Sequence, residues 1–407
     1  MNILPFVQLF NAAGARLRDL GLPLVPFDSK SFMAQASKKT KLQDFGDSSF
    51  LEPLNILLEA CEKEARLSMV GRLAVKGETI RLLGNRLILT QDRKTYPEIS
   101  QEPITSPIFI VGLPRTGSTF LHNLLAQDPG LRAPRMWETM FPSPPPGHPD
   151  SQTESPIRQT DQLLKGFYLV APKFKIVHPM TAQDPTECVT IMSHSFMSAQ
   201  FQSTYHIPSY QKWLESGNLR PTYVDHRQFL QQLQWGSQPR QWILKAPAHI
   251  LSLESLLAVY PDAKIVQTHR SPHAVLGSVS SLDVILRQAF SRSVDPQAIG
   301  QEALTQWANA VQRAMNVRDA VSTQRHQFYD VLYNALEQHP IRTIEQMYQH
   351  FGLTLTNTAK SNMQNYLLRH PNHKNGTHRY TLSQFGLTQE TIFSHFKPYI
   401  LRYNLDT

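Results

Sequence analysis

Short runs of apolar residues alternate with longer segments of helical spacing from about residue 105 to the C-terminus. Runs of strand length occupy residues 108–111, 242–245, 264–268 and 327–333, whereas residues 295–321 and 341–351 have the spacing of amphipathic helices. Continuous apolar runs of four to six residues are typical of parallel strands that are covered on both faces. The pattern predicts an α/β fold with a parallel sheet flanked by helices.

The N-terminal part of the chain has a different pattern. Residues 30–97 have helical spacing throughout, and residues 3–20 form an amphipathic segment that we expect to pack on the body of the protein or to lie on a membrane. A polar, proline-containing stretch at 91–105 follows. We therefore predict a helical N-terminal region at 1–104 and an α/β catalytic domain at 105–407.

The first predicted strand leads directly into a glycine loop. Residues 112–117 read Gly-Leu-Pro-Arg-Thr-Gly, and Ser118-Thr119 then open a helix whose apolar residues recur at helical spacing. Such a loop turns backbone N–H groups toward an anion at the positive end of a helix. Glycines allow backbone conformations and a close approach that a Cβ atom would block. The stretch predicts a P-loop-like phosphate cradle, although a tight strand-to-helix turn without a ligand would look similar.

The position of the positive charge narrows the choice of ligand. Gly112 and Gly117 have the spacing of the nucleotide-triphosphate motif GxxxxGK[ST], but Ser118 stands where that motif requires lysine. The cation lies inside the loop instead, as Arg115. A loop of this kind suits a terminal phosphate or sulfate on a nucleotide better than the γ-phosphate of ATP.

Charge and cysteine content limit the remaining classes of function. The chain carries 40 Lys and Arg against 32 Asp and Glu, a net charge of +8, which suits a polyanionic ligand. No run of basic residues exceeds two, so we expect no nucleic-acid partner. The two cysteines, Cys61 and Cys188, have no metal-ligand spacing, and we expect no metal. No apolar run approaches about 20 residues, so we expect a cytoplasmic protein with possible peripheral membrane contact.

The loop and a second motif resemble one family. Gly112-Leu-Pro-Arg-Thr-Gly-Ser-Thr119 resembles the 5′-phosphosulfate loop of sulfotransferases that use 3′-phosphoadenylyl sulfate (PAPS), in particular the bacterial branch that resembles tyrosylprotein sulfotransferases. In that family a strand ends in an arginine and a serine follows eight residues later, which matches Arg270 and Ser278. The resemblance implies that the latter two hold the 3′-phosphate of the donor. It also implies that the 5′-phosphosulfate contacts Arg115, Thr116, Gly117, Ser118 and Thr119.

Two further segments extend the resemblance. The strand that ends in Lys245-Ala-Pro is similar to the Lys-x-Pro element of the tyrosylprotein enzymes, which implies that Lys245 reaches the transferring sulfuryl group. The segment from Gly376 resembles the C-terminal loop of bacterial members, which folds over the nucleotide and implies a donor contact for Arg379.

The general base has several candidates. Enzymes of the tyrosylprotein type use a glutamate about twenty residues after the loop arginine, and Glu138 lies near that position. Glu187 and His178 are alternatives, as is His194, because other members use histidine. The implied catalytic group is thus Arg115, Lys245 and Glu138. The implied reaction gives a sulfate ester and adenosine 3′,5′-bisphosphate, with the hydroxyl acceptor open among phenol, lipid, glycan and peptide.

Two other function classes fit parts of the sequence. A nucleotide kinase or NTPase would use the same glycine loop, but it would need the missing lysine. A basic, non-catalytic module for membranes or nucleic acid would use the net charge, but it would not need Arg270 and Ser278 at their spacing. Tight binding of adenosine 3′,5′-bisphosphate relative to ATP or AMP separates the three classes.

Overall fold

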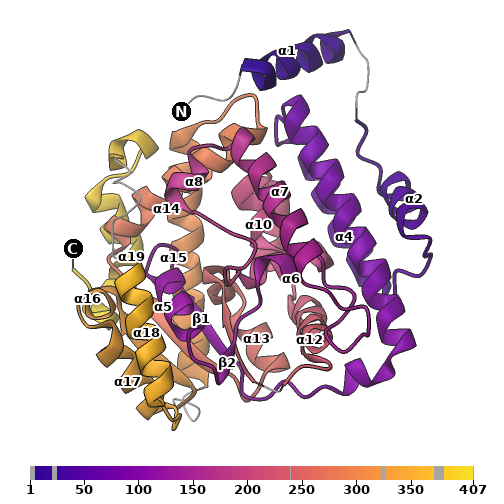
Figure 1. The fold of residues 1–407 in the computed structure, drawn as a ribbon. Helices are drawn as coiled ribbons and strands as arrows, with labels where there is room; N and C mark the ends of the chain where they lie inside the picture. Colours follow the sequence, from indigo (N-terminus) through magenta and orange to yellow (C-terminus); the bar gives the residue numbers. More distant parts are fainter. Residues whose placement is uncertain (1–4, 21–24, 239, 322–325, 371–379, 407) are drawn as a thin grey trace.

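The computed structural model describes residues 5–20, 25–238, 240–321, 326–370 and 380–406, and its centre is one parallel sheet (Figure 1). Five strands lie in the order β2-β3-β1-β4-β5, and every neighbouring pair runs parallel. The four predicted strands are confirmed, and the two-residue β2 was not foreseen. The strands are β1 Ile108–Gly112, β2 Leu131–Arg132, β3 Gln241–Lys245, β4 Lys264–His269 and β5 Phe328–Leu332.

Helices cover both faces of this sheet, as the sequence pattern predicted. The helix predicted at 3–20 is α1, and the helices predicted at 295–321 and 341–351 are α15 and α17. The helices are α1 Pro5–Asp19, α2 Ser29–Thr40, α3 Leu51–Lys63, α4 Met69–Thr95, α5 Ser118–Leu125, α6 Met136–Met140, α7 Glu154–Val170, α8 Phe174–Val177, α9 Cys188–Met192, α10 Ala199–Thr204, α11 Pro208–Ser216, α12 Arg220–Gln234, α13 Leu253–Val259, α14 Pro272–Phe290, α15 Pro296–Ala320, α16 Tyr333–Gln338, α17 Pro340–His350, α18 Asn357–Arg369 and α19 Gln389–Tyr403.

The side chains of β1 alternate between two hydrophobic layers, because successive residues of a strand point to opposite faces. Ile108 and Ile110 pack with buried residues of α5, α16, α17 and α18, whereas Phe109 and Val111 belong to the larger cluster that includes α12 to α15 and α19. Both faces of the central strand are therefore fully apolar, which explains its continuous apolar sequence.

The N-terminal helices share the larger of these two layers. Buried residues of α2, α3 and α4, such as Phe32, Leu54 and Leu87, belong to the same cluster as Phe109. In Figure 1, α4 runs along the right-hand side of the molecule, α1 crosses above its upper end, and α17 and α18 lie at the lower left. Among the residues described, no helix has the length and apolar character needed to span a bilayer.

The sheet topology determines where a ligand would bind. Strand β1 has β3 on one side and β4 on the other, so the order of the strands reverses beside it. In open parallel sheets, ligands bind outside the carboxyl ends of the strands at such a reversal. The loop after β1, Lys245 at the end of β3 and Arg270 directly after β4 all lie at this edge.

Candidate active site

The loop between β1 and α5 depends on two glycines. Gly112 has φ of 137°, and a Cβ atom there would lie 2.4 Å from the carbonyl oxygen of Thr268 in β4. Gly117 has φ of 84°, and its Cβ would crowd the ring of Tyr333 at 3.2 Å. Arg115 also adopts the left-handed region, with φ of 64°, a conformation that is uncommon for non-glycine residues and that often occurs at functional sites.

The side chain of Thr116 anchors this loop to the neighbouring strand. Its Oγ1 donates to the carbonyl of Leu113 at 2.7 Å and lies 2.6 Å from Oγ1 of Thr268. Both threonines are buried. The hydroxyl of Thr116 is thus occupied inside the protein, so only its main chain remains for a ligand.

The start of α5 carries the partial positive charge of a helix N-terminus. Gly117 is the N-cap residue, and no side chain caps the helix. The first amides of a helix have no intrahelical acceptor, so an anion can satisfy them. Ser118 and Thr119 are the first two residues of α5, with Ser118 buried and Thr119 exposed.

The two motifs that lie far apart in sequence meet at Arg115. Its Nε donates to Oγ of Ser278 in α14 at 3.2 Å, and Nη1 of Arg270 donates to the carbonyl oxygen of Arg115 at 3.0 Å. Burial lowers the pKa of the Arg115 guanidinium, and the neighbouring charge of Arg270 acts in the same direction. The site therefore concentrates positive charge that a bound anion would stabilise.

The guanidinium of Arg270 also lies over an aromatic ring. Its Cζ lies 3.9 Å from the ring centroid of Tyr333, the first residue of α16. This cation–π contact fixes the direction of the side chain. Sequence reasoning missed Tyr333, although its place directly after a strand at the ligand-binding edge was a usable signal.

Lys245 forms the second cationic group of the site. The side chain is only 2% exposed, and its Nζ donates to Oγ1 of Thr119 at 3.1 Å and forms an ion pair with Glu187 at the start of α9. The side chain of Glu187 is 27% exposed. A lysine, a helix N-terminus and a carboxylate are thus brought together at the end of β3.

The protonation states of Glu187 and His178 follow from their surroundings. Burial raises the pKa of Glu187, but the charge and the hydrogen bond of Lys245 act in the opposite direction, and the net pKa lies below its ordinary value. Burial lowers the pKa of His178 to about 4, although Glu187 opposes this effect. At neutral pH, Glu187 is therefore an anion and His178 is a neutral ring, and both can accept a proton or a hydrogen bond.

Glu138 of α6, the base that the resemblance favoured, is held by two residues that precede this helix. Its Oε1 accepts from Arg132 at 2.9 Å, and its Oε2 accepts from the amide of Arg135 at 2.8 Å. Arg132 is paired in register with Trp242, three residues before Lys245 in β3. Three strand residues at about 3.3 Å each span roughly 10 Å, so Arg132 lies roughly 10 Å before the level at which β3 ends. The carboxylate oxygens of Glu138 therefore contact Arg132 of β2 and the amide of Arg135, which precedes α6.

His194 is buried between helices, where Nε2 lies 3.0 Å from Nδ2 of Asn85 in α4 and Nδ1 lies 3.1 Å from main-chain carbonyls of Thr190 and Ile191. These contacts are those of a packing residue. Arg379 lies outside the described residues. Within the described part of the chain, no group of three or more His, Cys, Asp or Glu side chains could hold a metal ion.

Comparison with known proteins points to one family. A sequence profile described as the sulfotransferase family matches residues 107–357, more than half of the chain. Two proteins of Mycobacterium bovis and Mycobacterium tuberculosis, each named omega-hydroxy-beta-dihydromenaquinone-9 sulfotransferase Stf3, are 24% identical over 306 residues, which cover 74% of this chain and 75% of theirs.

Solved structures agree with these sequence matches. Sulfotransferase STF1 of Mycobacterium tuberculosis is 33% identical, with a TM-score of 0.80 over 91% of this chain and 98% of its own. Sulfotransferase STF9 of Mycobacterium avium is 25% identical, with a TM-score of 0.86 over 95% of this chain and 98% of its own. The similarity extends over the N-terminal helices as well as the sheet.

Proposed function

The chain belongs to the sulfotransferase family, and from this premise we propose that it moves the sulfuryl group of PAPS to a hydroxyl acceptor. The products would be a sulfate ester and adenosine 3′,5′-bisphosphate. The observation that carries this proposal is the junction of Arg115 with Arg270 and Ser278, because it joins a 5′-phosphate loop to a second anion-binding pair. Family membership also disfavours the kinase and the non-catalytic binding module.

The donor would bind along this junction. Its 5′-phosphosulfate would lie on the amides of residues 115–119 and the hydroxyls of Ser118 and Thr119, and its 3′-phosphate would lie between Arg270 and Ser278. Each charge-assisted hydrogen bond of this kind contributes about 1.5–3 kcal/mol. Arg379 remains a proposed additional contact to the nucleotide.

The transfer step would depend on fixed cations. In an in-line displacement the acceptor oxygen bonds to sulfur while the bond from sulfur to the bridging phosphate oxygen breaks, and the electron pair leaves with the phosphate. Charge builds on the bridging and equatorial oxygens, as in phosphoryl transfer. Arg115 is the cation within the loop and Lys245 is the cation beside it, so we assign both to those oxygens.

We assign the general base to Glu187, with His178 beside it, in place of the expected Glu138. Glu187 is an anion within contact of Lys245, whereas both oxygens of Glu138 are used within the β2–α6 segment. When the sulfuryl oxygens share Lys245, Glu187 loses part of its counter-charge and becomes a stronger base. It would then take the proton of the acceptor hydroxyl as the new bond to sulfur forms.

For the acceptor we propose a lipid-borne hydroxyl. The support is the name of the two mycobacterial relatives, whose acceptor is a hydroxylated menaquinone. The experiment is transfer from radiolabelled PAPS by the purified chain to total lipid, peptide and glycan extracts, followed by identification of the labelled product. Label in the lipid fraction supports the acceptor class, and no transfer to any fraction would overturn the proposed activity.

A further inference from the structure

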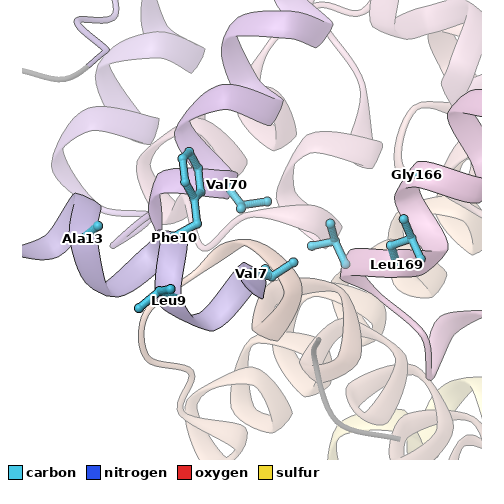
Figure 2. A pocket seen from close by; sticks show the side chains of 8 residues that line it. Val7, Leu9, Phe10, Ala13, Val70, Gly166 and Leu169 are labelled. Atoms are coloured by element: carbon cyan, nitrogen blue, oxygen red, sulfur yellow. The ribbon is translucent and has the colours of Figure 1, made fainter. Parts of the chain in front are cut away.

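An apolar cavity opens between three helices on the N-terminal side of the molecule. It measures about 710 Å³ and lies between α1, α4 and α7, and its lining is entirely apolar (Figure 2). The main contributors are Val7, Leu9, Phe10, Val70, Leu169 and Val170. Leu9 is 73% exposed and Leu169 is 50% exposed, so a large part of this surface faces outward.

The apolar surface continues along both longer helices. Leu73 follows the lining residue Val70 by three positions in α4, and Leu163 precedes Gly166 by three in α7, which places each on the same helix face. Both leucines are exposed. A Cβ atom at Gly166 would meet nothing within 4 Å, so the space beside α7 is open. Single exposed leucines are ordinary, but a contiguous group marks an interaction surface.

Helix α1 is docked against the first turn of α4. The Oδ1 of Asn11 accepts from the amide of Val70 at 3.0 Å, and a Cβ atom at Gly14 would lie 2.6 Å from Cβ of Met69. The small residue therefore lets α1 approach the first turn of α4 closely. The outward-facing Leu9 and Phe10 are thus presented by a docked helix.

Positive charge borders this apolar surface. Residues 162–177, which cover the C-terminal half of α7 and all of α8, contain three lysines and no acidic residue, whereas Glu154 and Asp161 lie in the N-terminal half of α7. Lys165, Lys173 and Lys175 are exposed, and Nζ of Lys175 lies 5.7 Å from the ring centroid of Tyr168 in α7. Exposed apolar side chains bordered by lysines are the pattern by which proteins bind an anionic membrane surface.

The same segment leads directly to the catalytic group. Ile176 of α8 is exposed. His178 follows two residues later, and the charges of Glu187 and Lys245 affect its pKa. The hydroxyl of Tyr168 holds this connection, since it contacts both the amide and the carbonyl of Met180 at 2.8 and 3.1 Å. The apolar surface and the catalytic site are therefore neighbours along α7 and α8.

We infer that the face formed by α1, α4, α7 and α8, which we call the apolar face, docks on an anionic lipid bilayer. Docking would bring the end of α8 to the membrane surface, where a lipid hydroxyl could reach Glu187. This inference rests on the proposed function for its biological purpose, but the docking itself can be measured without any transfer.

The test is co-sedimentation of the full chain with vesicles of phosphatidylcholine, with and without phosphatidylglycerol. We expect binding that requires phosphatidylglycerol and weakens as salt increases. The double variant Leu9→Glu/Leu169→Glu should lose at least about tenfold in partitioning into vesicles, because it places charge on the face that would enter the bilayer. The triple variant Lys165→Glu/Lys173→Glu/Lys175→Glu should lose at least about tenfold at low salt, since each lysine near such a surface contributes about fivefold.

The matched control is Leu368→Glu, which changes an 80% exposed leucine on α18 at the opposite side of the molecule (Figure 1). Leu368→Glu should bind vesicles like the wild type. Urea unfolding of every variant reports an intact fold, and calorimetric binding of adenosine 3′,5′-bisphosphate reports the proposed function separately. The inference is overturned if the wild type ignores vesicles, if the double variant binds them normally, or if the double variant instead splits a dimer in solution. If any of these outcomes occurs while the chain binds adenosine 3′,5′-bisphosphate normally, the docking inference fails and the proposed function stands. If the chain binds vesicles but does not bind the bisphosphate, only the proposed function fails.

Discussion

The Nζ of Lys245 forms an ion pair with the carboxylate of Glu187, 58 positions earlier in the chain, beside the first turn of α5. The lysine is buried, and without this partner its charge would be costly to hold. A phosphosulfate bound at the loop would compete with Glu187 for the same ammonium group. In our account this competition couples donor binding to the basicity of Glu187.

Replacement of Glu187 by glutamine should abolish most of the turnover. The amide keeps the size of the side chain but cannot take the acceptor proton, and removal of a general base typically costs about a hundredfold to ten-thousandfold. Binding of adenosine 3′,5′-bisphosphate should be retained, because the variant loses a negative charge near the anion site. Steady-state transfer and calorimetry measure the two effects separately.

The matched control is Glu138→Gln. We expect a lower free energy of unfolding in this variant, because Arg132 loses a largely buried ionic partner. Turnover should fall far less than in Glu187→Gln. The opposite result, with Glu138→Gln inactive and Glu187→Gln near normal, would return the base to the residue that the sequence pattern favoured.

Arg115 should be sensitive even to a conservative change. Lysine keeps the charge but cannot reproduce the planar, two-point contact of a guanidinium. We expect a partial loss of transfer in Arg115→Lys and a loss of about a hundredfold to a thousandfold in Arg115→Ala, as for other donors to a developing oxyanion. Steady-state kinetics check this, and wild-type turnover in Arg115→Ala would remove the loop from the mechanism.

Arg270 should control recognition of the 3′-phosphate. Arg270→Ala is expected to weaken adenosine 3′,5′-bisphosphate binding by at least about tenfold, the equivalent of one charge-assisted hydrogen bond, and to leave AMP binding nearly unchanged. Arg402→Ala is the control, since this arginine forms a partly exposed ion pair with Asp319 on α15. A wild-type preference for the bisphosphate in Arg270→Ala would contradict the assignment.

Buried histidines should make the fold sensitive to acid. Burial lowers the pKa values of His122, His194 and His226 from 6.5 to about 3. Between these values the unfolded chain binds more protons than the folded chain, so the free energy of unfolding falls as the pH decreases from about 6.5 toward 3. Stability from these groups is fully present above pH 6.5.

The variant His194→Asn measures this effect for one residue. Removal of one such histidine should reduce the slope of the unfolding free energy against pH by up to about 1.4 kcal/mol per pH unit within that window. Urea unfolding at several pH values gives the slope. His395→Asn, at an exposed position on α19, should leave it unchanged, and an unchanged slope in His194→Asn would show that His194 does not contribute.

Much of the fold could be read from the sequence because local patterns determine it. The apolar runs of β1, β3, β4 and β5 and the helical spacing of α15 and α17 each reflect a periodicity that survives packing. Strand β2 escaped notice because two residues carry no periodicity. Its position depends on pairing with β3, which is a tertiary contact.

The candidate site could likewise be predicted only in part from the sequence. A common site for Arg115, Arg270 and Ser278 was implied by the resemblance of the two motifs to the sulfotransferases, and the structure brings the three residues together. The choice between Glu138 and Glu187 could not be made from spacing, because both follow segments of irregular structure. It rests on the contact between Glu187 and Lys245, a tertiary contact across 58 positions of the chain that has no local sequence signal.

The most direct test of the central claim is calorimetric titration of the purified full chain with adenosine 3′,5′-bisphosphate and with AMP. The two ligands differ only in the 3′-phosphate that Arg270 and Ser278 are proposed to hold. Our account predicts that the bisphosphate binds at least about a hundredfold more tightly, since the additional phosphate gains two hydrogen bonds to this pair, one of them charge-assisted on both sides. Equal affinity for the two nucleotides would contradict the assignment of this site to a PAPS-type donor.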